Sequence, residues 1–167
     1  MKSWLRLTLV TMTVGGGFAG FAGTFLTLSN SQGEGLLALV LRVVFLVLYM
    51  YITISGLMFV HNQRIVRPLA AALAMQIPWI SSPLLVYDVA AGPSAVIGVG
   101  SPTQAGKLFT IDWQLLMGSS WRFEILQGAR WRMSVNLLAL ALLILLRKST
   151  QTGSSTASHA TSADPNS

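Results

Sequence analysis

Six polar side chains stand in or beside otherwise apolar stretches of the chain, and their types could do chemistry. An ionisable or amide side chain at membrane depth is costly unless it is paired, so such residues mark sites by default. The chemistry open to them is hydrogen bonding and ion pairing. We expect an intramembrane or interfacial polar cluster made of Arg42, Gln76, Ser81, Ser82, Asp88 and Asn136.

Arg42 allows two interpretations. It lies near one end of an apolar segment, so its guanidinium could reach the membrane interface along its aliphatic stem. Alternatively, it could form an ion pair with Asp88 or with Glu34. The sequence leaves both open.

No catalytic set accompanies these residues. The chain has no glycine-rich phosphate loop, no G-x-S-x-G elbow and no pair of metal ligands at helical spacing. It has no Cys, which excludes disulfides and thiolate metal sites. The expected membrane segments hold no Asp or Glu, which argues against a proton-coupled antiporter built around a buried carboxylate. We therefore expect no enzyme, no cofactor and no metal ion.

The composition is that of a membrane protein. Hydrophobic residues make up 53% and charged residues 10%, whereas soluble proteins average about 25% charged residues. The net charge is +6. The basic residues flank apolar segments, as orientation signals do, so the expected partner is the lipid bilayer and not nucleic acid.

Apolar segments long enough to span a bilayer predict an all-α fold of four transmembrane helices, over about 5–28, 36–60, 67–87 and 131–147. Together with the loop at 88–130 they form one domain, 1–148. The polar residues 149–167 lack large apolar side chains, and we expect them to be disordered. Lys2 and Arg6 before the first segment also fit a signal peptide, but its long apolar run favours an uncleaved helix.

The first and third segments carry special features. Gly16, Gly20 and Gly23 would let another helix approach closely, either within one chain or in a homodimer. Pro78 and Pro83 should kink the third helix. A kinked helix is either a structural element or, as in transporters, part of a binding site.

The loop at 88–130 contains short alternating strands at 108–116 and 120–126, with a third at 95–99. We expect a small antiparallel hairpin or three-stranded sheet, with a three-residue turn at 117–119 that pairs Trp113 with Phe123. Its aromatic face would cover the helix ends or dock a protein or lipid. This candidate docking face consists of Phe109, Trp113, Trp121 and Phe123.

Basic residues fix the expected orientation. Three flanks on one side carry basic residues without acids, which predicts that both termini are cytoplasmic and that 88–130 is periplasmic. These flanks hold Lys2, Arg6, Arg64, Arg67, Arg147 and Lys148.

Four short motifs resemble those of small multi-pass proteobacterial membrane proteins. They are Gln76-Ile77-Pro78, Ser81-Ser82-Pro83-Leu84-Leu85, Gly118-Ser119-Ser120-Trp121 and Asn136-Leu137. The resemblance covers roughly residues 5–147. It implies the bacterial inner membrane and no particular reaction.

Two functions follow from these features. The first is a non-enzymatic structural or accessory component of the bacterial inner membrane, acting as a homo-oligomer or with another membrane protein. The second is a binder or carrier of a small molecule or lipid that uses the kinked third helix. A polar cavity would favour the second function, and a dry bundle would favour the first.

Overall fold

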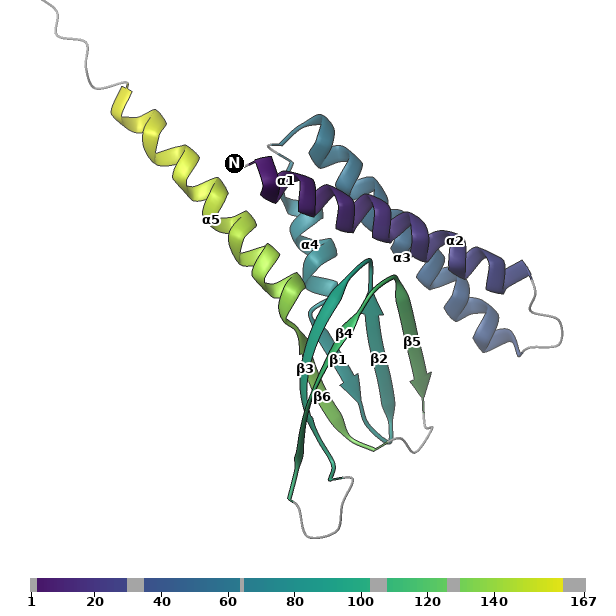
Figure 1. Ribbon diagram of the computed structural model, residues 1–167. Helices are drawn as coiled ribbons and strands as arrows, with labels where there is room; N and C mark the ends of the chain where they lie inside the picture. The colour runs from purple at the N-terminus through teal and green to yellow at the C-terminus, as the bar shows by residue number, and fades with distance from the viewer. Residues whose placement is uncertain (1–2, 30–34, 64, 103–107, 126–129, 161–167) are drawn as a thin grey trace, which may run out of the picture.

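A computed structural model describes residues 3–29, 35–63, 65–102, 108–125 and 130–160. The chain begins with one long helix, formed by α1 (Ser3–Val10), a single π-helical stretch η1 (Thr11–Gly15) and α2 (Gly16–Ser29). Helix α3 (Leu36–His61) runs back along it (Figure 1). Both helices, Ser3–Ser29 and Leu36–His61, are long and apolar enough to cross a membrane, by length and composition.

The other two expected membrane helices are only partly helical. Helix α4 (Arg67–Met75) is followed by strands β1 (Pro78–Ser81) and β2 (Leu85–Ala90), and α5 (Leu137–Ala160) is preceded by β6 (Arg132–Asn136). Strands β3 (Ser94–Gly100), β4 (Thr110–Leu116) and β5 (Ser120–Ile125) complete a six-stranded antiparallel sheet. The expected all-α fold with a small hairpin is therefore wrong. The fold combines helices with a full sheet.

Local chemistry explains both helix-to-strand changes. A proline inside a helix lacks the N–H donor and its ring clashes with the preceding turn, so Pro78 cannot continue α4. At the other boundary, Trp131, Met133 and Val135 alternate with polar residues. This period of two is the pattern of a strand. The expected helix over 131–147 therefore begins only at Leu137, after β6.

The two central strands of the expected hairpin do form, but they do not pair with each other. The strand order is β4-β3-β6-β1-β2-β5, which puts β4 and β5 at opposite edges. Trp113 of β4 lies opposite Ile97 of β3, and Phe123 of β5 lies opposite Tyr87 of β2. The predicted pairing of Trp113 with Phe123 is therefore wrong.

The short link at 117–119 forces the sheet to curl. Neighbouring strands lie about 4.8 Å apart, so the edges of a flat six-stranded sheet would be about 24 Å apart. The four steps from Leu116 to Ser120 reach about 14 Å at most. The sheet must therefore bend until its two edges approach each other at this end.

The curled sheet has one polar face and one apolar face. Residues directly opposite on neighbouring strands share a face. On each face, one row of directly opposite residues crosses all six strands. We call the two faces the inner face and the outer face. The inner row is Thr110, Gly100, Arg132, Ser81, Val86 and Glu124, and the outer row is Ile111, Val99, Met133, Ile80, Tyr87 and Phe123.

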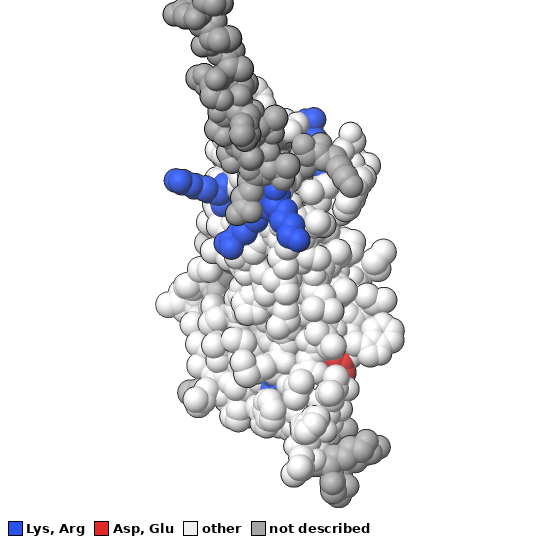
Figure 2. Space-filling view, turned by 90° about the vertical axis from the view of Figure 1, so that its left-hand side faces the viewer, with Lys and Arg blue, Asp and Glu red and all other residues white. Residues whose placement is uncertain are grey.

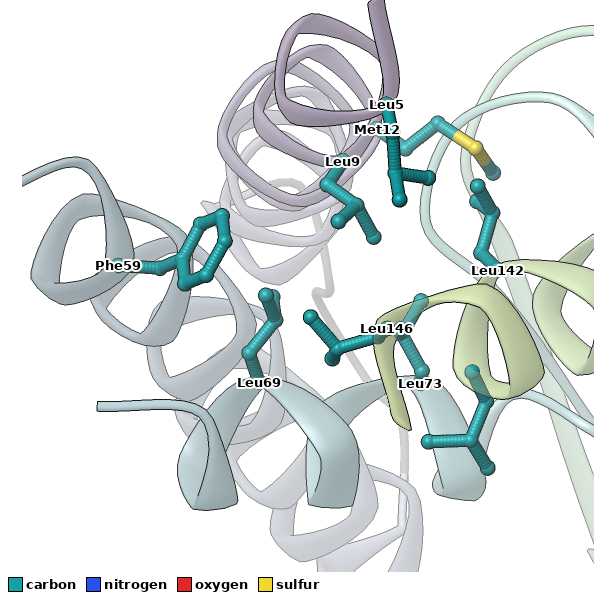
Figure 3. Close-up of a cluster of buried hydrophobic side chains, with 9 residues drawn as sticks. Leu5, Leu9, Met12, Phe59, Leu69, Leu73, Leu142 and Leu146 are labelled. Atoms are coloured by element: carbon teal, nitrogen blue, oxygen red, sulfur yellow. The ribbon is translucent and has the colours of Figure 1, made fainter. Parts of the chain in front are cut away.

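Side chains from the helices meet in a buried apolar core (Figure 3). Leu9 of α1, Phe59 of α3, Leu69 of α4 and Leu146 of α5 are all buried there. These helices therefore pack as a bundle around this core.

Helix α5 continues to Ala160, through residues that we expected to be disordered. The remaining part of the expected tail, 161–167, lies outside the described residues.

Candidate functional site

The inner face of the sheet lines a half-open cavity of about 350 Å³. Small-molecule sites have volumes of roughly 300–1,000 Å³, so this cavity could hold a small ligand or one end of a larger one. It lies toward the end of the sheet away from α4 and α5. The side chains that give it its chemistry are Ser81, Asp88, Thr110, Asp112, Arg122, Arg130, Arg132 and Ser134.

Two ion pairs lie on the cavity wall. Arg122 Nε is 3.2 Å from Asp88 Oδ2, and these two residues are directly opposite each other on β5 and β2. Arg132 of β6 pairs with Asp112 of β4. The Asp88 side chain is 14% exposed and that of Arg122 is 62% exposed, so the acid is held inside while the base reaches outward.

The second ion pair crosses an intervening strand. Strand β3 lies between β4 and β6, and it presents Gly98 and Gly100 to the inner face. A Cβ at Gly98 would collide with the Ser134 hydroxyl and approach Asp112 Oδ1 to 3.1 Å. Because these positions have no side chain, Arg132 can reach Asp112 over β3.

Besides Arg132 Nη2, which lies in the ion pair with Asp112, two polar atoms on the cavity wall lack a hydrogen-bond partner within the described residues. Arg132 Nε and Thr110 Oγ1 are both buried. Leaving a buried donor unsatisfied costs about 1–3 kcal/mol. Acceptor oxygens placed in the cavity would satisfy these two donors.

Two residues of the expected polar cluster line this cavity. Asp88 does so through the Arg122 pair. Ser81 also lines it, and its hydroxyl donates to the Arg130 carbonyl oxygen at 3.0 Å. Ser82 does not, since its hydroxyl bonds to Leu85 O and accepts from Leu85 N in the turn between β1 and β2.

Gln76 and Asn136 join helices to strands. Gln76 is buried at the end of α4, where Nε2 donates to Ala72 O (3.0 Å) and Oε1 accepts from Ala91 N (2.9 Å). Asn136 Oδ1 accepts from Ala139 N at 3.3 Å, at the start of α5. Neither residue lines the cavity.

Arg42 lies apart from this cavity. Its Nη1 donates to Thr27 O at 2.9 Å, which links α3 to α2. Asp88, one partner expected for Arg42, pairs with Arg122 instead. The other expected partner, Glu34, lies outside the described residues. The expected cluster is therefore divided among several places.

The candidate docking face is divided as well. Trp121 stacks on Phe45 of α3 with ring centroids 4.3 Å apart, and Phe123 lies tilted against the same ring at 6.3 Å. Trp113 and Phe109 are exposed and lie on or next to β4, the opposite edge strand. The part of this set on β5 covers a helix.

The glycines of the first helix have different surroundings. A Cβ at Gly16 would lie 2.4 Å from the backbone of Ala91 and Gly92, and one at Gly20 would overlap the Tyr49 ring. At Gly23 nothing lies within 4 Å. Gly16 and Gly20 thus form close contacts within the chain.

Sequence reasoning did not single out Thr110, Asp112, Arg122 or Arg132 as site residues. Their signal was the alternation itself, which puts them all on one face once the strands are paired as in the sheet. Within the described parts of the chain, no cluster of three or more acidic or His side chains could hold a metal ion.

Comparisons of the chain with protein-family models, with curated proteins and with solved structures gave no match.

Proposed function

We propose that the chain is an integral membrane protein that binds a small anionic ligand in the cavity of its sheet. The observation that carries this proposal is the Arg132 side chain, whose buried Nε lacks a hydrogen-bond partner within the described residues. It shares the wall of a cavity of about 350 Å³ with the Thr110 hydroxyl, which also lacks a partner there.

The charges of the wall favour an anion. The lining includes three arginines, at 122, 130 and 132, and two aspartates, at 88 and 112. Two ion pairs account for two of these arginines, which leaves an excess of one positive charge. A guanidinium matches the planar oxygens of a carboxylate or phosphate, so a ligand carrying one of these groups fits best.

The membrane location is supported by the two long apolar helices and by the distribution of charge. Arg6 Nη2 donates to Val60 O, next to His61 at the end of α3. Leu69 and Leu146, close in sequence to Arg67 and Arg147, pack together in the core nearby. The basic residues thus gather at one end, which the positive-inside rule assigns to the cytoplasm. Figure 2 shows this basic group above a broad surface without charged side chains.

The cavity supports the second of the two functions expected from the sequence. A purely structural component has no need of a cavity lined by charged side chains, so the cavity favours the binder. The binding site differs from the one expected, because Pro78 lies on β1 and Pro83 in the turn after it. No kinked third helix is available to line a site.

The test uses the purified chain in lipid nanodiscs, with thermal unfolding measured against a panel of small carboxylates and phosphomonoesters. We expect at least one anion to raise the Tm in proportion to the logarithm of its concentration. Thr110→Val, which keeps the shape of the side chain but removes its hydroxyl, should weaken this shift. Thr27→Val is the matched control, because its hydroxyl bonds to Thr24 O on α2, far along the chain from the sheet.

Two outcomes contradict the proposal. One is a panel in which no anion changes the Tm of the wild-type chain. The other is an anion whose effect is the same in Thr110→Val as in the wild type, which would place its binding outside the cavity.

A further inference from the structure

We propose that the sheet itself lies within the lipid bilayer, with its outer face against the acyl chains in the half of the membrane away from the basic end. This inference rests on the membrane location proposed above. It goes beyond that proposal by assigning lipid acyl chains as the partner of the sheet.

The outer face is apolar and uncovered over β3, β4 and β6. Ile111, Trp113 and Leu115 of β4 are 63%, 73% and 68% exposed, and Met133 of β6 is 64% exposed. Ile97 and Val99 of β3 lie between them and are also exposed. A contiguous exposed apolar surface of this kind marks a protein or membrane contact.

The sheet lies beside the first half of α3, one of the two helices proposed to span the membrane. The Tyr49 hydroxyl, midway along α3, is 3.0 Å from Ala90 O and 2.7 Å from Ser120 O, at one end of the sheet. From there β5 runs beside the first half of α3, where Trp121 stacks on Phe45. If acyl chains surround this half of α3, they also surround the sheet beside it.

Two helix–strand pairs, α4 with β1 and β6 with α5, form continuous segments about as long as the hydrocarbon layer is thick. Helix α4 has 9 residues and β1 has 4. With the two residues between them they follow a path of about 30 Å, which is close to the hydrocarbon thickness. Strand β6 and the first half of α5, as far as Leu146, give a similar path of about 31 Å.

Residues at the two ends of the second combined segment suit the membrane interfaces. Arg147 and Lys148 follow Leu146 at the basic end. Exposed Trp131 and Arg130 precede β6 at the other end. Trp is enriched at membrane interfaces, and Arg reaches the headgroups from there.

The curl of the sheet agrees with this location. Unpaired sheet edges are costly in hydrocarbon because water cannot satisfy their backbone groups. The link at 117–119 brings the two edge strands together at the end level with Tyr49, which would be the deepest in the bilayer. The polar inner face, with its ion pairs, is turned away from the lipid.

Acyl chains fit the outer face better than a protein partner does. Protein interfaces have a polar rim and carry hydrogen bonds. The exposed outer positions of β3, β4 and β6 carry only apolar side chains, and the apolar surface continues onto α5 at Leu137, Ile144 and Leu145.

The experiment uses single cysteines, which are unambiguous because the full chain has no Cys. Cysteine replaces Ile111, Trp113, Leu115 or Met133 on the sheet and Val47 on α3. Leu108→Cys is the water-exposed control, since this residue lies just before β4, at the end of the sheet away from Tyr49, and would stand outside the hydrocarbon. Two readouts are taken in proteoliposomes. They are the rate of labelling by a membrane-impermeant maleimide and the quenching of a bimane label by doxyl-labelled phospholipids.

We expect the sheet cysteines to label as slowly as Val47→Cys, while Leu108→Cys labels fast. The doxyl lipids should quench the bimane at each sheet position. Leu115 and Ile111 are four residues apart, about 14 Å along β4. A doxyl group near the end of the acyl chain should therefore quench label at 115 more than at 111, and one near the headgroup should do the reverse.

Three results would overturn the inference, and they are distinguishable. Fast maleimide labelling on the sheet with protection at Val47 would place the sheet in water while the membrane location stands. Slow labelling without doxyl quenching would mean that a protein, such as a second copy, covers the face. Fast labelling at Val47 would overturn the membrane location, and with it the proposed function.

Discussion

Arg132 on β6 forms an ion pair with Asp112 on β4, although strand β3 lies between them. The contact depends on Gly98 and Gly100, which leave this end of the inner face of β3 without side chains. The shape of the cavity wall therefore depends on these two glycines as well as on the charged residues. Substituting a glycine should perturb this wall directly.

Gly98→Ala should destabilise the fold by about 1–3 kcal/mol, the usual cost of overpacking. The new methyl group would collide with the Ser134 hydroxyl. The measurement is the thermal unfolding of the purified chain in mild detergent. Adding Ser134→Ala should recover part of the loss, because it removes the atom nearest the clash. Equal Tm values for Gly98→Ala and the wild type would mean that β3 and β6 are farther apart than described.

Gly16→Ala should lower stability by about 1–3 kcal/mol for a related reason. Its methyl group would meet the backbone of Ala91 and Gly92, which cannot rotate away as a side chain can. Gly23→Ala on the same helix has open space around it, and it should be neutral or gain up to about 1 kcal/mol from helix propensity. The two variants are compared by the same unfolding assay. Similar effects at both positions would contradict the close approach of the helix to the turn between β2 and β3.

Tyr49→Phe should cost about 1 kcal/mol through the lost hydrogen bonding at Ala90 and Ser120. Tyr51→Phe is the control, since its exposed hydroxyl makes one long contact of 3.3 Å with Pro68 O. We expect the control to stay within about 0.5 kcal/mol of the wild type. Limited proteolysis of the sheet should accelerate for Tyr49→Phe alone, because the tyrosine ties the sheet to α3.

Gln76→Leu should destabilise by about 1–3 kcal/mol, since it leaves the buried Ala91 N–H without its acceptor. Gln114→Leu is an exposed counterpart on β4 and should change stability by less than about 0.5 kcal/mol. Both are measured by thermal unfolding in detergent. If Gln76→Leu unfolds like the wild type, the amide does not join α4 to the turn as described.

The sequence predicted the fold best where a pattern of residues fits only one kind of secondary structure. The two long apolar segments, 5–28 and 36–60, agree with the described helices within two residues at each end. The alternation around Trp113 and around Trp121 identified β4 and β5 and the residues that share a face. It could not identify their partners, because alternation is a property of one strand and pairing is a property of two.

The third and fourth segments misled for a physical reason. An apolar run of moderate length fits a membrane helix or a buried strand equally well by hydrophobicity alone. Pro78 was interpreted as a kink, whereas it ends a helix. The sequence favours orientation signals for the basic residues that flank apolar segments, whereas Arg132 lines a cavity. Of the cavity residues, Ser81 and Asp88 were named in advance, and the ion-pair partners could be found only from the strand order.

The central place of β6 has a consequence for biogenesis. It lies between β3 and β1, yet it is the last strand to be synthesised. Until it emerges, β4 with β3 and β1 with β2 and β5 are two separate ribbons, each with an unpaired edge. Non-local pairing of this kind is slow and leaves exposed edges open to aggregation. Completion of the sheet must therefore wait until residues 132–136 have left the ribosome, so a truncated chain that lacks them cannot assemble the sheet at all.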